Sequence, residues 1–207
     1  MIRGIVISAA LAALAAPAWA GDLVVTVTTP DGKPLPDAVV TIPATPGAPK
    51  PSFAWKQEIA QKDKTFTPFV LIAPVGSVVS FPNLDKFRHH VYSFSKGNKF
   101  EIDLYGKDET RSAPPFKTVG AVALGCNIHD EMVAFVRVVD TPWAAKTDAT
   151  GHAEIKDAPD GKVKITVWHP YAKGRDQTVS ADATLTAGAP ATITVVVQAT
   201  PAPMHHH

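Results

Sequence analysis

The sequence predicts an all-β protein without a helix of any length. Its apolar residues alternate with polar ones in short runs, as over 162–168, where Val163, Ile165 and Val167 share one face. The chain also has 19 Pro and 13 Gly, residues that interrupt helices and mark turns. A hydrophobic fraction of 45% is sufficient for a buried core. We therefore expect β-sheets packed face to face.

The N-terminus has the pattern of an export signal. Arg3 is followed by an Ala/Leu/Ile-rich run and by an Ala-Trp-Ala motif that ends at Ala20, the small-x-small pattern of a signal-peptidase site. We expect a signal peptide over 1–20 and a periplasmic mature chain that begins at Gly21. The apolar run over 4–16 is shorter than the roughly 20 residues that a spanning helix needs, so no membrane span is predicted.

The charge balance argues against nucleic acid as a partner. The chain has 20 basic and 19 acidic residues, which gives a formal net charge of +1. A balance so close to neutral provides no electrostatic footprint for nucleic acid or for an anionic membrane.

A single cysteine, Cys126, limits the possible functions further. Exported proteins use cysteines mainly as disulfide pairs, so a cysteine without a second one indicates an intermolecular bridge, a reactive thiol or a metal ligand.

The strand pattern falls into blocks. Strands are expected over 23–28 and 38–42 around a Pro-Asp-Gly turn, then a Pro-rich loop over 43–52, a β-rich block over 65–139 and a third block over 146–198.

Two separated segments carry a family resemblance. The motif GKPLPDAVV over 32–40 and the stretch from Thr147 to Pro170 resemble the two halves of a carboxypeptidase-regulatory-like, or transthyretin-like, β-sandwich. This resemblance implies a discontinuous outer sandwich over 21–44 plus 143–200. The segment 45–142 would be inserted in it, and 201–207 would form a flexible tail.

The middle block contains a set of metal-binding residue types. Cys126, His129 and Met132 have C-x2-H-x2-M spacing between two apolar strands, 121–124 and 133–139, and a His89-His90 pair lies upstream. Two imidazoles, one thiolate and one thioether form the ligand set of a type 1 copper site. Zinc is disfavoured because it rarely uses Met. His90 competes with His89 as the upstream ligand, since neighbours on a strand point to opposite faces and only one can reach the metal.

Over 66–140 the chain resembles the cupredoxin family, especially its plastocyanin-like and amicyanin-like members. The resemblance rests on F-x-N-x-D over 81–85, H-x-V from His89, and the C-x2-H-x2-M loop. It implies a Greek-key β-sandwich that binds one type 1 (blue) copper ion through His89, Cys126, His129 and Met132. It also implies an apolar surface patch at His129, and it places His90 where these proteins use an Asn to tie the ligand loops together. Several exported proteins of methylamine utilisation look similar.

The expected function is that of a periplasmic carrier of single electrons, not an enzyme. By the resemblance, its redox partners would be proteins such as a c-type cytochrome or a dehydrogenase, and Asp130 and Glu131 would favour a basic docking face. One alternative is a copper protein for storage, delivery or resistance. A second is a metal-free adhesion or carbohydrate-binding sandwich in which Cys126 is merely buried.

Overall fold

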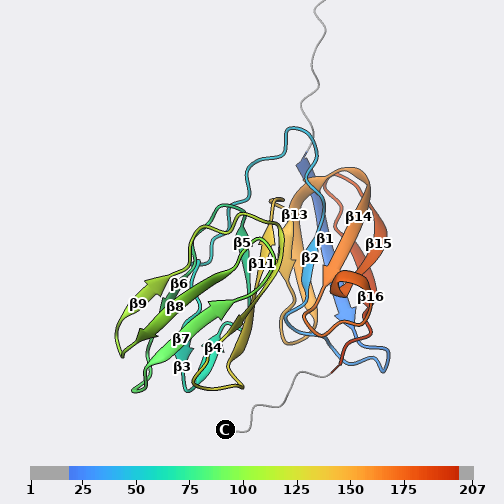
Figure 1. Cartoon of the computed structure of the whole chain (residues 1–207). Helices are drawn as coiled ribbons and strands as arrows, with labels where there is room; N and C mark the ends of the chain where they lie inside the picture. The colour runs from blue at the N-terminus through green and yellow to red at the C-terminus, as the bar shows by residue number, and fades with distance from the viewer. Residues whose placement is uncertain (1–18, 201–207) are drawn as a thin grey trace, which may run out of the picture.

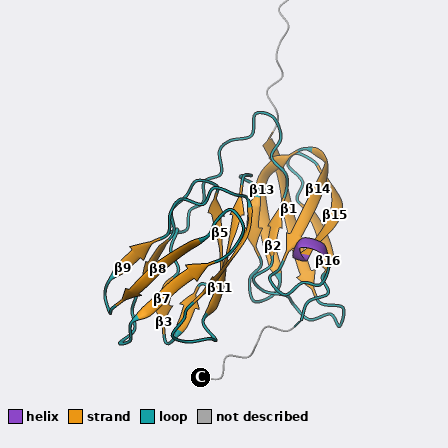
Figure 2. Cartoon of the chain, viewed as in Figure 1, coloured by secondary structure: helices purple, strands orange, loops and turns teal. Residues whose placement is uncertain are grey.

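The computed structural model describes residues 19–200, and β-strands dominate them (Figures 1 and 2). The prediction of an all-β protein is confirmed, because within 19–200 the helical content is a single 3-10 turn, η1 (Arg175–Gln177). No helix in this range is long and apolar enough to cross a membrane. The predicted signal peptide and tail lie outside the described residues, except that strand β1 begins at Trp19.

One lobe, the outer sandwich, combines strands from both ends of the described chain (Figure 1). Its first sheet has the order β13-β1-β16, and its second has the order β12-β2-β14-β15. The strands are β1 (Trp19–Thr28), β2 (Val39–Thr41), β12 (Ala144–Lys146), β13 (His152–Pro159), β14 (Gly161–Trp168), β15 (Thr178–Leu185) and β16 (Ala191–Val196). The exact domain boundaries over 21–44, 143–200 and 45–142 stay predictions.

The second lobe, the inner sandwich, contains the strands from β3 to β11 and is joined to β2 by a long connection that passes over the top of the two lobes in Figure 1. A five-stranded sheet has the order β5-β11-β10-β7-β8, and two strand pairs, β3-β4 and β6-β9, complete the lobe. The strands are β3 (Ala60–Lys62), β4 (Thr65–Thr67), β5 (Val70–Pro74), β6 (Ser80–Pro82), β7 (His89–Ser93), β8 (Phe100–Tyr105), β9 (Thr110–Ser112), β10 (Gly120–Gly125) and β11 (Val133–Val139).

Alternating side chains form the cores as the sequence pattern predicts. In β14, Val163, Ile165 and Val167 are buried, whereas the alternate residues Lys162 and Lys164 are exposed. This period-2 pattern gives the sheet an apolar face that packs inward. Each sandwich buries such faces in a separate hydrophobic cluster, and both cysteine and methionine of the predicted ligand loop belong to the inner one.

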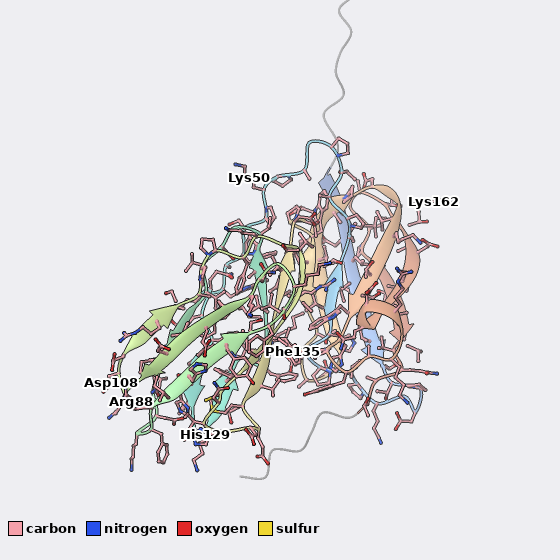
Figure 3. The ribbon with its side chains drawn as sticks, viewed as in Figure 1. Lys50, Arg88, Asp108, His129, Phe135 and Lys162 are labelled. Atoms are coloured by element: carbon pink, nitrogen blue, oxygen red, sulfur yellow. The ribbon has the colours of Figure 1, made fainter. Side chains whose placement is uncertain are left out.

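The two sandwiches contact one another through a third apolar cluster. It joins Trp168 of β14 and Val39 of β2 to Val70 and Ile72 of β5. In addition, Lys146 donates hydrogen bonds from Nζ to Asp37 Oδ1 at 2.7 Å and to the Val70 carbonyl at 3.0 Å. Strand β5 of the inner sandwich is therefore held against the outer sandwich. His129 lies at the lower end of the inner lobe in Figure 3.

Candidate metal centre

Antiparallel pairing brings the two ligand-bearing segments together. Strands β7 and β10 pair antiparallel through Tyr92 and Gly125, so the part of β7 before Tyr92 runs alongside the residues that follow Gly125. His89 is the first residue of β7, and Cys126 directly follows β10. Strand β10 pairs with β11 along its whole length, from Gly120 to Gly125. The loop from Cys126 to Met132 is therefore held at both ends by a regular hairpin.

Three of the four predicted ligands form a compact buried group. The Cys126 Sγ lies 3.8 Å from the His89 Nδ1, and the candidate ligand atoms of His89, Cys126 and His129 all lie within 4.8 Å of one another. The two imidazole rings have a centroid separation of 5.2 Å. His89 and Cys126 are 0% and 3% exposed, whereas His129 is partly accessible. The structure thus assembles a thiol and two imidazoles from loops that are distant in sequence.

The arrangement fits a shared metal ion. Ligands bonded at lengths typical of His nitrogen and Cys sulfur, about 2.05 and 2.3 Å, and separated by about 120°, lie about 3.8 Å apart. The Cys126 Sγ and the His89 Nδ1 are separated by this same distance, 3.8 Å. The Nδ1 of His129 is also buried and has no hydrogen-bond partner among the described residues. A buried nitrogen lone pair is costly unless something binds it, and a metal ion would do so.

Met132, the fourth predicted ligand, is 1% exposed and belongs to the same apolar cluster as Cys126. Its backbone N–H donates to the His129 carbonyl at 3.0 Å, which turns the end of the loop back toward β11. A thioether in this position suits the weak axial role that Met has in His2Cys copper sites.

The structure separates the two neighbouring histidines. His89 joins the group, while His90 points toward β8, where its Nε2 lies 3.0 Å from Glu101 Oε1. His90 is therefore not part of this group. Its Nε2 bonds to Glu101 and its Nδ1 has no hydrogen-bond partner among the described residues, so no hydrogen bond of this ring ties it to the Cys126 loop as the resemblance implies. Alternation of side chains along β7 explains the difference.

Two polar residues that the sequence analysis assigned no role hold His89 in place. Asp85 Oδ2 lies 2.8 Å from His89 Nε2. Asn83 accepts the Asp85 N–H at 2.9 Å and donates to the Phe87 and Tyr105 carbonyls at 2.7 and 3.1 Å. The F-x-N-x-D motif before the histidine pair could have indicated this role of Asn83 and Asp85, because short polar residues in a turn often form local hydrogen bonds.

Electrostatics favours an ionised Asp85 and a neutral His129. Burial opposes ionisation of Asp85, but hydrogen bonds from the Lys64 N–H, from His89 and from the Asp63 N–H together hold its pKa below the ordinary value. Burial lowers the pKa of His129, and the nearby His89 and Lys64 lower it further against the opposing effect of Asp85. At neutral pH the His129 ring therefore keeps the lone pair that a metal requires.

Exposed apolar side chains lie on the two ligand loops. Leu84, Phe87 and Ile128, here called the apolar rim, are 50%, 50% and 48% exposed. The Phe87 ring packs edge-on against His129 with a centroid separation of 6.2 Å. Lys64 Nζ lies 5.3 Å from the Phe87 ring centroid, so the rim has a positive charge beside it. The exposed Asp130 and Glu131, which follow His129, supply negative charge. The position of Lys64 could not be deduced from the sequence spacing.

The chain matches solved structures of copper proteins. A purple cupredoxin from Nitrosopumilus maritimus is 21% identical, over 40% of this chain and 98% of that chain, with a TM-score of 0.35. A reduced mutant of amicyanin is 19% identical, over 48% and 98%, with a TM-score of 0.37.

A copper-containing nitrite reductase from Thermus scotoductus is 27% identical, over 47% of this chain but only 25% of its own, with a TM-score of 0.39. No family model and no curated protein sequence matches the chain. Each of these structural matches covers less than half of the chain, so inferences about its chemistry depend on its own side chains.

Proposed function

We propose that this chain is a type 1 (blue) copper protein that carries single electrons, with the ion bound by His89, Cys126, His129 and Met132. The observation that supports it best is the convergence of one thiol and two imidazole nitrogens within 4.8 Å, one of them a buried nitrogen without a partner among the described residues. Thiolate, imidazole and thioether ligands together suit copper and fit both of its oxidation states.

The protein's own contribution is a fixed and nearly dry ligand set. Copper supplies the one-electron chemistry, and the chain has to keep the ligand atoms in one arrangement in both redox states. The β10–β11 hairpin fixes the ends of the ligand loop, and the inner core surrounds Cys126 and Met132. Such bracing reduces the reorganisation that accompanies gain or loss of an electron, and burial around the sulfur sets the potential.

His129 is the proposed point of electron entry and exit. It is the partly accessible member of the group, and its ring contacts Phe87 of the apolar rim. A redox partner that covers the rim would exclude water and approach the imidazole edge closely. We propose a periplasmic protein such as a c-type cytochrome or a dehydrogenase as partner, and a carrier role rather than catalysis. That the protein takes part in methylamine utilisation stays a prediction.

Addition of Cu(II) tests the proposed function. We expect the colourless metal-free protein to develop an intense visible absorption at one equivalent of Cu(II), because the Cys126 thiolate is placed to bond the ion together with two imidazoles. We further expect the band to disappear on reduction, to return on oxidation, and to persist for hours in excess chelator. Rapid loss of copper to the chelator would favour storage or delivery, and absence of any band would refute the proposal.

The apolar rim should control the rate of exchange with a partner. Replacement of Phe87 with Asp puts a charge beside His129, which the partner would have to desolvate. We expect the second-order rate of reduction by a small c-type cytochrome, measured by stopped flow, to fall about tenfold, or about 1.4 kcal/mol. Phe94→Asp is the matched control: Phe94 is 69% exposed and follows the opposite end of β7 from His89. Equal slowing in both variants would contradict this docking site.

A further inference from the structure

Asp85 is the hub of a hydrogen-bonded cluster that ends on a proposed ligand. The residue is 8% exposed. Its carboxylate accepts the Asp63 N–H on Oδ1 at 2.7 Å and the Lys64 N–H on Oδ2 at 2.9 Å. The same Oδ2 lies 2.8 Å from His89 Nε2. Three donors from two separate segments thus converge on one buried carboxylate.

The two backbone donors come from a turn whose backbone conformation is unfavourable for residues other than Gly or Asn. Lys62 and Thr65 pair across the β3–β4 hairpin, which leaves Asp63 and Lys64 as its two central residues. Both have positive φ values, 53° and 57°, the values of a type I′ turn, for which Gly or Asn is preferred. The bonds to Asp85 compensate for this strain, and in return the turn fixes the orientation of the carboxylate.

An ionised carboxylate has acceptors and no donor, and that of Asp85 already accepts two N–H groups. The hydrogen bond between Asp85 and His89 must then be donated by the His89 Nε2–H. A neutral imidazole carries one proton, so the Nδ1 of His89 keeps its lone pair, and this is the atom that faces the Cys126 sulfur at 3.8 Å. The bond to Asp85 therefore keeps the proton of His89 on Nε2 and leaves the Nδ1 lone pair free to bind a metal ion.

We propose that Asp85 is a positioning residue that holds His89 in the Nε2–H tautomer and, through its negative charge, stabilises the oxidised more than the reduced copper site. The first part concerns the metal-free protein, and the second rests on the proposed function. A carboxylate bonded to a ligating imidazole raises the basicity of that ligand, and loss of such a partner typically changes metal affinity by about 10–100-fold. The more basic ligand favours the more highly charged Cu(II).

The tautomer is testable without copper and without a variant. In the metal-free wild-type protein, ¹⁵N NMR of the imidazole rings at neutral pH should show the proton of His89 on Nε2. A proton on Nδ1 would overturn the proposal. This measurement stands even if the protein fails to bind copper, so it separates the role of Asp85 from the proposed function.

The charge effect is tested by Asp85→Asn, which keeps the size of the side chain but removes its charge. We expect Cu(II) affinity to fall about tenfold more than Cu(I) affinity, which corresponds to a rise in reduction potential of about 59 mV. Asp103→Asn is the matched control, since Asp103 is exposed on β8 in the same sandwich and the charge change is identical. Equal potentials in the wild type and in a copper-loaded Asp85→Asn variant would overturn the charge effect, as would an equal rise in the control.

Discussion

Replacement of Cys126 with Ser should abolish the visible absorption that Cu(II) induces. The serine hydroxyl is nearly the same size as the thiol, but it is not deprotonated at neutral pH and forms no copper–thiolate bond. Two imidazoles and a thioether would remain, so weak binding of Cu(II) can persist without intense colour. The measurement is a Cu(II) titration followed by visible absorption, with residual binding followed by equilibrium dialysis.

A folded control keeps this result interpretable. Ala123→Ser places a hydroxyl on the same strand, β10, at an exposed position, and it should leave the band unchanged. Far-ultraviolet circular dichroism should show the same β-sheet content in both variants. Full colour in the Cys126→Ser variant would refute the assignment of the thiolate as a ligand.

The largest effect on stability should come from Trp168→Ala at the junction of the two sandwiches. Trp168 is 1% exposed, its ring packs against Phe135 of β11 with a centroid separation of 6.0 Å, and the Arg137 guanidinium lies 5.3 Å above it. Truncation of a buried Trp to Ala costs about 3–5 kcal/mol through lost contacts and the cavity that remains. We expect a corresponding loss in the free energy of unfolding, measured by urea denaturation of the metal-free protein.

Trp55→Ala provides the comparison. Trp55 is 41% exposed, stacks on Phe53 and donates from Nε1 to the Ile72 carbonyl at 2.9 Å, so its removal should cost clearly less. A loss below about 1 kcal/mol in Trp168→Ala would show that the junction contributes little to folding. Separate unfolding transitions in that variant would show that Trp168 couples the two sandwiches.

Local patterns in the sequence predicted much of the candidate site. The spacing of Cys126, His129 and Met132 between apolar strands was enough to place them on one tight loop. The alternation rule also showed that only one residue of the His89-His90 pair can face inward. It could not show which one, because the two residues are identical in chemistry and both are buried.

Other parts of the site could not be deduced in this way. Asp85 receives donors from a hairpin turn some twenty residues earlier in the chain, and Glu101 reaches His90 from the neighbouring strand. Lys64 lies over Phe87 only because that turn is held against the ligand loop. Contacts of this kind depend on how strands pair, and no periodicity in the sequence encodes them.

The sequence by itself determined that the chain is all β and which residue types could bind a soft metal ion, because side-chain alternation and ligand chemistry are local properties. Only the tertiary structure decided that His89 rather than His90 meets Cys126, that Asp85 holds its other nitrogen, and that Trp168 joins the two lobes. The physical reason is that these outcomes depend on strand pairing and on close packing between segments, which short-range patterns leave open.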